Sequence, residues 1–337
     1  MKVSGTWRAC DSVYDEVSGT FRKIHAAPRA IFKCSSGYGQ DITIYYMQIT
    51  IASALTYFGD LIMANREFAQ FSSSTRAIFA GGWLDQWETS YHDVRMQYIT
   101  MATTGNMTFF GNLSQTRQSA TGSSNQITGL IIGGLYYNYA VGQADYPLSS
   151  CESRTIATTG NASGWSDLAR YAREKPVAMA SPTRSIVCAG DCRDLNDFYG
   201  SPTTPLEILY CTFAGSAWVN FGDMVSAEWQ GKLAGASSNV RGVYGVGYVS
   251  KHLQYVTITT TGNALSFGDL ANYRWHLTAS SSKVKGVFSG GYNISSDSEI
   301  LTSESVYIST TANATSFGDL SIILEAGCAT STSHGGL

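Results

Sequence analysis

One phrase recurs six times along this chain and constrains its fold more than any other feature. The clearest copy is Tyr255-Val-Thr-Ile-Thr-Thr-Thr-Gly-Asn263, followed closely by Phe267-Gly-Asp-Leu270. The six copies end at Leu61, Leu113, Leu168, Met224, Leu270 and Leu320, 46 to 56 residues apart. A period of this length indicates that one supersecondary unit is repeated six times.

A second phrase lies between the copies of the first. Its best copy is Ser280-Ser-Ser-Lys-Val-Lys285-Gly-Val-Phe-Ser-Gly-Gly-Tyr292. These segments are short, rich in Val, Ile, Thr and Tyr, and bounded by Gly, Asn and Ser, which is typical of strands and turns. Each unit is expected to hold four strands, a (near 275–281), b (285–289), c (253–260) and d (264–270). Six such units predict an all-β, six-bladed β-propeller.

The order of the phrases also predicts how the ring closes. The first complete strand is a b strand at Arg29–Phe32, and the last recognisable strand is an a strand near 324–330. One blade should therefore combine both ends of the chain. Residues 29–337 are assigned to the propeller and residues 1–28 to an N-terminal extension. Because the extension carries Trp7, Tyr14 and Phe21, we expect either an additional strand on the propeller or an arm that docks onto a neighbour.

Composition excludes several classes of function. Charged residues make up only 14% of the chain and the net charge is -3, which argues against nucleic-acid binding. The sequence has no run of 18 apolar residues and no apolar stretch at its start, so neither membrane insertion nor export is expected. The seven cysteines are scattered, and Cys188 and Cys192 form the only close pair. We interpret them as thiols of a protein folded in a reducing compartment.

No catalytic constellation is recognisable. The five histidines show no pair spaced three or four residues apart, and no nucleophile elbow, phosphate loop or dinucleotide fingerprint occurs. Ionisable residues do not concentrate near any one predicted mouth of the propeller. We therefore expect no enzyme activity, no metal and no cofactor.

Acidic and basic residues vary together between repeats. Where the acid of Phe-Gly-Asp becomes Asn112, the following base becomes Thr128. This covariation predicts ion pairs that join successive blades. The predicted pairs are Asp60 with Arg76, Asp167 with Arg184, Asp223 with Arg241, Asp269 with Lys285, and Asp319 with Arg29 across the closure.

One rim of the propeller is the better candidate for binding. In an antiparallel blade the b–c and d–a loops emerge together, opposite the a–b and c–d turns. The turns are short and monotonous, whereas the loops are long and different in every blade, as recognition loops are. Aromatic residues concentrate in these loops and suit protein or sugar partners. The predicted binding residues are Trp83, Trp87, Tyr91, Tyr136, Tyr137 and Tyr139, with Trp229, Tyr273 and Trp275 on the same rim.

The repeat resembles kelch repeats, in which Gly-Gly ends the second strand and aromatic residues mark the third and fourth. Gly290-Gly291, Tyr255 and Phe267 lie at the matching places. The particular wording is similar to kelch-like repeats in virion proteins of tailed phages, including marine and cyanobacterial ones, and the similarity covers about residues 29–330.

This resemblance implies a non-enzymatic structural or adhesive component of a phage particle, such as a tail fibre, neck or capsid-decoration protein. It would be made in the host cytoplasm and would bind other virion proteins, a host-surface glycan or protein, and further copies of itself. The alternative is a carbohydrate-binding or hydrolytic propeller with its site at the mouth of the axis.

Overall fold

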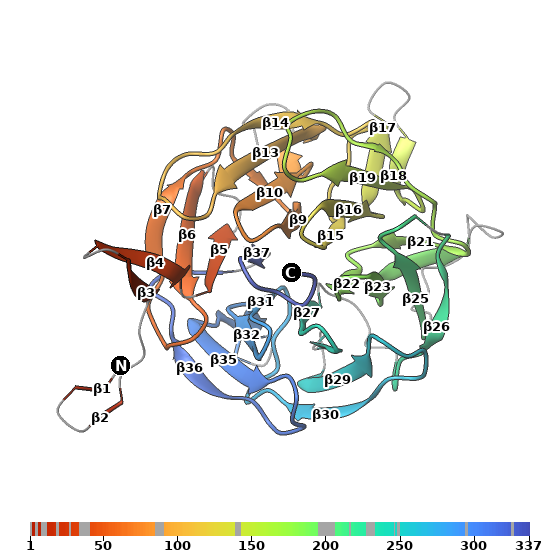
Figure 1. The fold of residues 1–337 in the computed structure, drawn as a ribbon. Coiled ribbons are helices and arrows are strands. Elements are labelled where there is room, and N and C mark those ends of the chain that lie inside the picture. The colour runs from red at the N-terminus through yellow and green to blue at the C-terminus, as the bar shows by residue number, and fades with distance from the viewer. Residues whose placement is uncertain are drawn as a thin grey trace.

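The computed structural model confirms a six-bladed, all-β propeller arranged around a central axis (Figure 1). It describes residues 2–3, 6–7, 12–17, 20–26, 28–33, 41–84, 91–138, 143–194, 206–215, 217–226, 233–245, 247, 250–293, 296–324 and 327–337. For residues 2–26, 91, 137–138, 143–145 and 193–194 it describes the backbone alone.

Each blade is an antiparallel sheet whose strands run a, b, c and d from the axis outward. Blade 1 contains β37 (Cys328–Ser331), β5 (Arg29–Lys33), β6 (Thr43–Gln48) and β7 (Thr56–Asp60). Blade 2 contains β9 (Ala69–Ser72), β10 (Arg76–Ala80), β13 (Arg95–Thr100) and β14 (Thr108–Asn112). Blade 3 contains β15 (Thr121–Ser124), β16 (Thr128–Ile132), β19 (Cys151–Thr155) and the short β20 (Ser163–Gly164).

The remaining three blades repeat this order. Blade 4 contains β22 (Val177–Ala180), β23 (Arg184–Cys188), β25 (Glu207–Thr212) and β26 (Val219–Asp223). Blade 5 contains β27 (Ala234–Ser237), β28 (Arg241–Gly245), β29 (His252–Thr257) and β30 (Leu265–Asp269). Blade 6 contains β31 (Thr278–Ser281), β32 (Lys285–Ser289), β35 (Thr302–Tyr307) and β36 (Thr315–Asp319).

The ring closes as the sequence predicts, because blade 1 joins the C-terminal β37 to the N-terminal β5. The extension contains β1 (Lys2–Val3), β2 (Thr6–Trp7), β3 (Ser12–Val17) and β4 (Thr20–Ala26). Among the described residues these strands form two hairpins, β1–β2 and β3–β4, and join none of the blades.

The hydrophobic core consists of six clusters, and each cluster lies between two successive blades. Between blades 4 and 5, for example, Ile186 and Phe221 pack with Tyr244 and Ile258. The tyrosine of strand c and the phenylalanine of strand d form an edge-to-face pair in four blades, with ring centroids 5.5 to 5.9 Å apart. These contacts explain why the repeat keeps both aromatic positions.

The basic residue of strand b lies over this aromatic pair and reaches the next blade. The Arg76 guanidinium lies 4.8 Å from the ring centroid of Tyr98, and its Nη1 donates to the carbonyls of Ile156 and Ala157 at 3.2 and 2.7 Å. Arg29, Arg184 and Arg241 make the same kind of contact to blades 2, 5 and 6. The arginines therefore join successive blades through backbone carbonyls.

The predicted acid–base pairs are wrong. The ion pairs recorded among the described residues do not join any of these arginines, or Lys285, to its predicted acid. The four arginines donate to turn carbonyls of the next blade instead, and the acids remain at the outer edge of each blade. There the Asp60 carboxylate accepts a bond from the Tyr57 hydroxyl, and Asp269 pairs with His252.

The Phe-Gly-Asp and Thr-Thr-Gly-Asn phrases meet between neighbouring blades. The amide of Gly105, in the c–d turn of blade 2, donates to the Phe58 carbonyl of blade 1 at 2.9 Å, and the Asp60 amide donates to Asn106 Oδ1 at 3.1 Å. A Cβ on Gly59 would lie 1.8 Å from the Gly105 carbonyl oxygen, so this position of strand d requires glycine. The turn that links strands c and d thus also caps the outer strand of the preceding blade.

A third set of contacts surrounds the axis, where serine occupies the last position of strand a in five blades. The Ser124 hydroxyl donates to the Ser72 carbonyl at 2.7 Å, and the Ser72 hydroxyl donates to the Ser331 carbonyl at 2.7 Å. Ser331 continues the ring to Ser281, Ser281 to Ser237, and Ser237 to the Ala180 amide. The serines thereby supply hydrogen-bond partners to backbone groups at the inner edges of successive blades.

Candidate functional site

The b–c and d–a loops form a second layer on one face of the propeller, which we call the loop face. β8 (Asn65–Arg66) of a d–a loop pairs with β11 (Trp83–Leu84), and β11 pairs with β12 (Tyr91–His92). Next to them are the hairpin β17 (Leu135–Asn138) with β18 (Gln143–Pro147) and the pair β21 (Tyr171–Glu174) with β24 (Asp191–Asp194). The loops therefore carry small sheets of their own.

Blade 6 carries a smaller version of this layer. β33 (Tyr292–Asn293) pairs with β34 (Ser298–Glu299), and Trp275 of the d–a loop forms a β-bridge to Tyr292. Trp275 stacks on His276 with ring centroids 4.3 Å apart. Tyr273 of the same loop is 44% exposed.

The predicted binding residues lie on the loop face where the structure describes them. Trp83 in β11 is half-buried, 5.4 Å from the His92 ring and 5.8 Å from the Arg66 guanidinium. Tyr136 in β17 is half-buried and packs edge-to-face on Tyr146 at 5.2 Å. Tyr91 and Tyr137 lie in β12 and β17, with only their backbones described. Trp87, Tyr139 and Trp229 lie outside the described residues.

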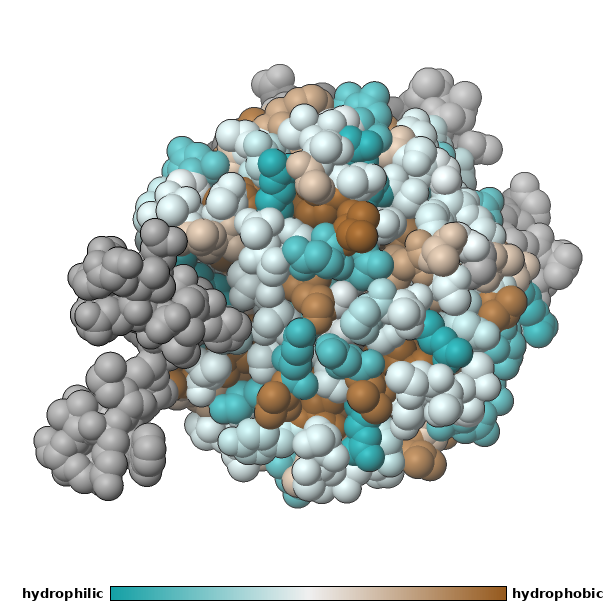
Figure 2. Space-filling view, in the orientation of Figure 1, coloured by the Kyte–Doolittle hydropathy of each residue, from teal (hydrophilic) through white to brown (hydrophobic). Residues whose placement is uncertain are grey.

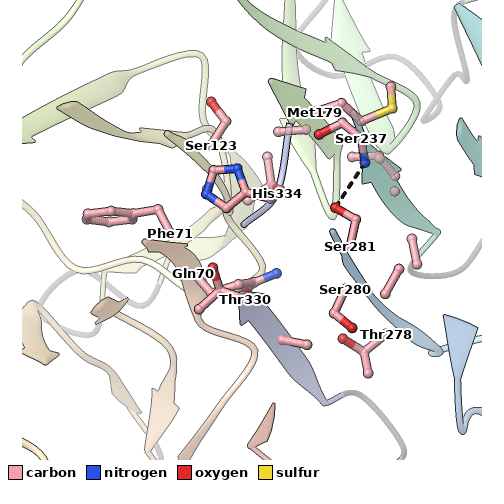
Figure 3. Close-up of a pocket in the computed structure, with 18 of the residues that line it drawn as sticks. Gln70, Phe71, Ser123, Met179, Ser237, Thr278, Ser280, Ser281, Thr330 and His334 are labelled. Carbon is pink, nitrogen blue, oxygen red and sulfur yellow. Dashed lines mark hydrogen bonds between the residues drawn. The ribbon is translucent and has the colours of Figure 1, made fainter. Parts of the chain in front are cut away.

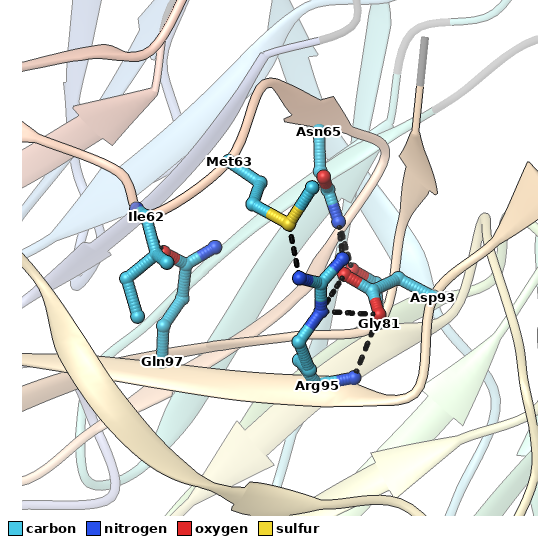
Figure 4. Close-up of polar contacts among 7 residues, drawn as sticks. All are labelled: Ile62, Met63, Asn65, Gly81, Asp93, Arg95 and Gln97. Carbon is cyan, nitrogen blue, oxygen red and sulfur yellow. Dashed lines mark hydrogen bonds and ion pairs between the residues drawn. The ribbon is translucent and has the colours of Figure 1, made fainter. Parts of the chain in front are cut away.

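A polar network anchors the loop face of blade 2 (Figure 4). The buried Asp93 carboxylate accepts bonds from Asn65 Nδ2 at 2.7 Å and from Arg95 Nε at 2.8 and 2.9 Å. Asn65 Nδ2 also donates to the Gly81 carbonyl, and the Gln97 side chain accepts a bond from the Ile62 amide. This network holds the d–a loop against the b–c loop that carries Trp83.

Buried arginines hold the loops of three other blades. Arg117 donates to the carbonyls of Gly133 and Ser150 at 3.0 Å and pairs with Glu152 at 2.7 Å. Arg173 and Arg274 occupy equivalent places beside Glu207 and Glu304. Burial lowers the pKa of Arg117, although Glu152 partly offsets this effect.

None of these three arginines is among the residues predicted from the sequence. Their signal was an arginine four or five residues after the repeated leucine, together with a glutamate on the following c strand. Three copies of the repeat show it.

Four d–a loop residues share an unusual backbone conformation, and two of them, Ser119 and Lys175, line the channel. Glu67, Ser119, Lys175 and His276 all adopt positive φ, between 53° and 58°, although none is glycine. The Ser119 amide donates to the Glu67 carbonyl at 3.0 Å, and the Lys175 amide donates to the Ser119 carbonyl at 2.8 Å. These bonds link one d–a loop to the next, and they hold the loops in a conformation that non-glycine residues rarely adopt.

Ionisable side chains do gather at the loop-face mouth of the channel, which corrects the expectation from the sequence. Lys175 pairs with Glu174 at 2.8 Å. Burial raises the pKa of Glu174 and of Asp191, and Lys175 opposes both shifts. Burial alone would lower the pKa of Lys175, but Glu174 and Glu67 outweigh it and raise the pKa. These four ionisable residues, Glu67, Glu174, Lys175 and Asp191, belong to d–a and b–c loops of different blades. Comparison of one repeat with the next therefore does not predict that they lie together.

The channel itself is narrow. Its cavity of about 100 Å³ is lined by the a strands, with small residues such as Gly122, Ala178 and Gly235 beside the larger Gln70 (Figure 3). Lys175 lines one end, and His334 lines the cavity from the C-terminal segment. This volume is well below the roughly 300–1,000 Å³ of typical ligand pockets.

The C-terminal segment 332–337 closes the channel on the face of the a–b and c–d turns, which we call the turn face. The Gly336 amide donates to His334 Nδ1 at 3.1 Å, so Nε2 carries the proton and donates to the Ser72 carbonyl at 3.2 Å. A Cβ on Gly336 would lie 1.8 Å from the Ser124 carbonyl oxygen, and one on Gly335 would lie 2.3 Å from that of Ser238. Two glycines are therefore needed for the segment to fit the axis.

The remainder of the turn face is polar and built from short turns. In the view of Figure 2, apolar side chains lie in small groups between polar ones. Ile127, Val240 and Val284, at equivalent places in three a–b turns, are each more than half exposed. Repetition of the same short turn gives this face little of the variety seen on the loop face.

The described cysteines are buried. Burial raises the pKa of Cys188 to about 12 and that of Cys192 to about 11, so both remain thiols at neutral pH. Within the described ranges, no group of three or more His, Cys, Asp and Glu residues could hold a metal ion. No helix in the described part of the chain has the length and hydropathy needed to cross a membrane.

Comparison with solved structures shows the fold. The structure titled "Structure of YjhT" matches with a TM-score of 0.67 at 9% identity, covering 85% of this chain and 94% of that one. At this identity the likeness concerns the fold alone. No protein-family model matches the chain, and no curated protein matches it by sequence.

Proposed function

We propose that this propeller is a non-enzymatic structural or adhesive component of a phage particle, and that its loop face binds the partner. The observation that carries the proposal is the contrast between the ring and the loop face. Three sets of repeated contacts make the ring a scaffold, and a layer of non-repeating sheets presents aromatic side chains on it. A propeller fold suits such a protein-interaction role.

The partners would be other virion proteins and a host-surface glycan or protein, and copies of the chain could contact one another on the particle. The sequence of the repeat, which resembles repeats in virion proteins of tailed phages, supports a location on a phage particle. Trp83 and Tyr136 are the anchors that the structure describes, and their side chains are fixed by His92 and Tyr146. Fixed aromatic anchors lose little conformational entropy on binding.

The alternative, a carbohydrate-binding or hydrolytic site at the axis, has weaker support. A cavity of about 100 Å³ holds only a few water molecules, and the C-terminal segment occupies one mouth. The Glu174–Lys175 pair at the other mouth is mutually neutralising rather than poised on a substrate.

Purification of particles tests the location, and two substitutions test the face. The protein should remain with virions through a density gradient, and the double variant Trp83→Ala/Tyr136→Ala should reduce its incorporation or host adsorption at least about tenfold. Val240→Ala on the turn face is the matched control and should change neither. Equal loss from Val240→Ala would show that the loop face is not the binding surface. Absence from purified virions would refute the location.

The N-terminal extension is proposed as a second attachment element. Removing residues 1–24 should abolish incorporation and leave the thermal transition of the propeller unchanged, because the extension's strands pair only with one another among the described residues. A truncated protein that unfolds would instead indicate that the extension is part of the propeller.

A further inference from the structure

Polar contacts between blades are unequally distributed around the ring. Junctions 1/2, 2/3, 4/5 and 5/6 each have an arginine of strand b that donates to a carbonyl of the next blade. At the same four junctions, a c–d turn is hydrogen-bonded to the outer strand of the preceding blade. The other two junctions, 3/4 and 6/1, lack both contacts among the described residues, and we call them the seams.

At seam 3/4 the described residues make none of the three kinds of contact, namely the arginine–carbonyl bond, the turn-to-outer-strand bond and the serine bond at the axis. Thr128 replaces the arginine, and Ser166 replaces the glycine of Phe-Gly-Asp. The Gly215 amide donates within its own turn, to the Thr212 carbonyl, and neither Gly215 nor Ala217 bonds to the outer strand of blade 3. Ala180 replaces the serine that would reach Ser124 across the axis.

Apolar contact joins the blades at this seam instead. Trp218 is buried against Cys151, Leu168 and Leu209, and Trp165 packs on the same cluster. Two polar contacts are also present on this side: the buried hydroxyl pair Ser123 with Ser185, and a 3.2 Å bond from Asn125 Nδ2 to the Pro182 carbonyl. Apolar contact is non-directional, so it holds the blades together without fixing their angle as hydrogen bonds do.

Seam 6/1 lies opposite, three junctions away. Lys285 replaces the arginine, and its ammonium lies over the rings of Tyr307 and Phe317 at 5.5 and 5.0 Å. A Cβ on Gly318 would have Ala52 Cβ as its nearest neighbour at 3.7 Å, whereas at junctions 1/2, 2/3, 4/5 and 5/6 a turn carbonyl lies within 2.4 Å of the equivalent position. The c–d turn of blade 1 therefore does not close onto blade 6 as its counterparts do.

The C-terminal segment crosses between the two halves that the seams define. His334 bonds to Ser72 and Ser124 in blades 2 and 3. Gly335 packs against the carbonyls of Ala180 and Ser238, in blade 4 and in the a–b turn of blade 5. The segment thus supplies contacts at the axis where the serine ring is interrupted.

We propose that the propeller consists of two rigid bodies, blades 1–3 and blades 4–6, which move against each other at the two seams, and that residues 332–337 latch them together. Withdrawal of the segment would leave the turn side of seam 3/4 held by its apolar cluster and two polar contacts, while backbone bonds of Arg173 to Gly134 and Leu148 still join the loop face. The latch lies at the turn-face mouth, so its release would open the channel and change the angle between the two halves of the loop face.

The test uses spin labels on exposed outer-strand positions of the full-length chain, with Cys10 and Cys34 replaced by serine. Labels at positions 163 and 219 span seam 3/4, and labels at 219 and 265 span junction 4/5, which serves as the matched control. Double electron–electron resonance gives the width of each distance distribution. The wild-type chain should already show a broader distribution across the seam.

The variant Gly335→Ala/Gly336→Ala should displace the segment, because the new Cβ atoms would collide with backbone carbonyls. We expect the 163–219 distribution to become roughly twice as wide and the 219–265 distribution to stay unchanged. Equal broadening of both pairs, or of neither, would overturn the proposal. If the double variant does not fold, Arg241→Thr in the wild-type background provides the second measurement. It should broaden the distribution between labels at 265 and 315, across junction 5/6, to a width between those of junction 4/5 and the seam, because the turn and serine contacts remain. An unchanged width would overturn the proposal.

Discussion

Junctions 2/3 and 3/4 flank the same blade and are built differently on the turn face. Junction 2/3 has Arg76, the Gly160 turn capping β14, and Ser124 at the axis. Junction 3/4 has threonine, serine and alanine at the corresponding places and is joined by a tryptophan-containing apolar cluster. On the loop face the two junctions are alike, since Arg117 and Arg173 are both buried. A blade interface can therefore close mainly by apolar contact on one face, provided that the other face is held by polar contacts.

The largest effect should come from the buried arginine of the loop face, which the two junctions share. Arg117→Ala leaves Glu152 buried without a partner and should lower the free energy of unfolding by about 3–5 kcal/mol. Denaturant titration measures the loss. The double variant Arg117→Met/Glu152→Met is the control and should lose clearly less, because no charge is left uncompensated. An Arg117→Ala variant of wild-type stability would show that the pair does not hold the loop face.

The second largest effect should come from the glycine of strand d, whose substitution should destabilise junction 2/3 but not junction 3/4. A Cβ on Gly111 would lie 2.1 Å from the Gly160 carbonyl oxygen, so Gly111→Ala should cost about 2–4 kcal/mol. Ser166→Ala, at the same place in blade 3, should change the free energy of unfolding by less than about 0.5 kcal/mol. Comparable losses of unfolding free energy in the two variants would show that a c–d turn packs on the outer strand at junction 3/4 as it does at junction 2/3.

Removal of the blade-spanning arginine should have a smaller effect. Arg76→Thr loses two bonds to carbonyls and a cation–π contact, and should cost about 1–2 kcal/mol. Thermal unfolding followed by circular dichroism is sufficient to detect it. Arg76→Lys should recover part of the loss, because the ammonium can still lie over Tyr98. If Arg76→Lys loses as much stability as Arg76→Thr, the stabilisation by Arg76 comes from its bonds to the carbonyls alone.

The last prediction concerns pH and acts on the docking of the C-terminal segment alone, so it should change the stability of the whole propeller least. Burial lowers the pKa of His334 to about 4, opposed in part by the bond to the Ser72 carbonyl. The released segment binds the proton with an ordinary histidine pKa near 6.5, so docking is fully favoured above that pH and weakens as pH falls toward 4, by at most about tenfold per unit. The 163–219 distance distribution should broaden over this interval. His334→Gln should remove the pH dependence, and a dependence that survives would assign it to another group.

Much of the fold was predictable because the repeat is local. Apolar alternation, Gly-Asn turns and the six-fold period are properties of short segments, and they determine strands, blade count and the closure through β37 and β5. The predicted ion pairs failed because covariation along a chain does not specify which partner a side chain meets. The guanidinium of Arg76 found turn carbonyls of blade 3, which carry no signal in side-chain identity.

The sequence by itself determined six four-stranded units, their order and the position of the loops relative to the turns. Only the tertiary structure decided which polar groups meet: the arginines buried beside glutamates, the four ionisable groups at the channel mouth, and the C-terminal segment on the axis. The physical reason is that hydrophobic periodicity acts within a strand, whereas most of these contacts join residues from different loops and blades, up to more than 200 positions apart, through backbone atoms and packing. Glycines 335 and 336 are ordinary in the sequence, and they become indispensable only when two carbonyls approach them from other blades.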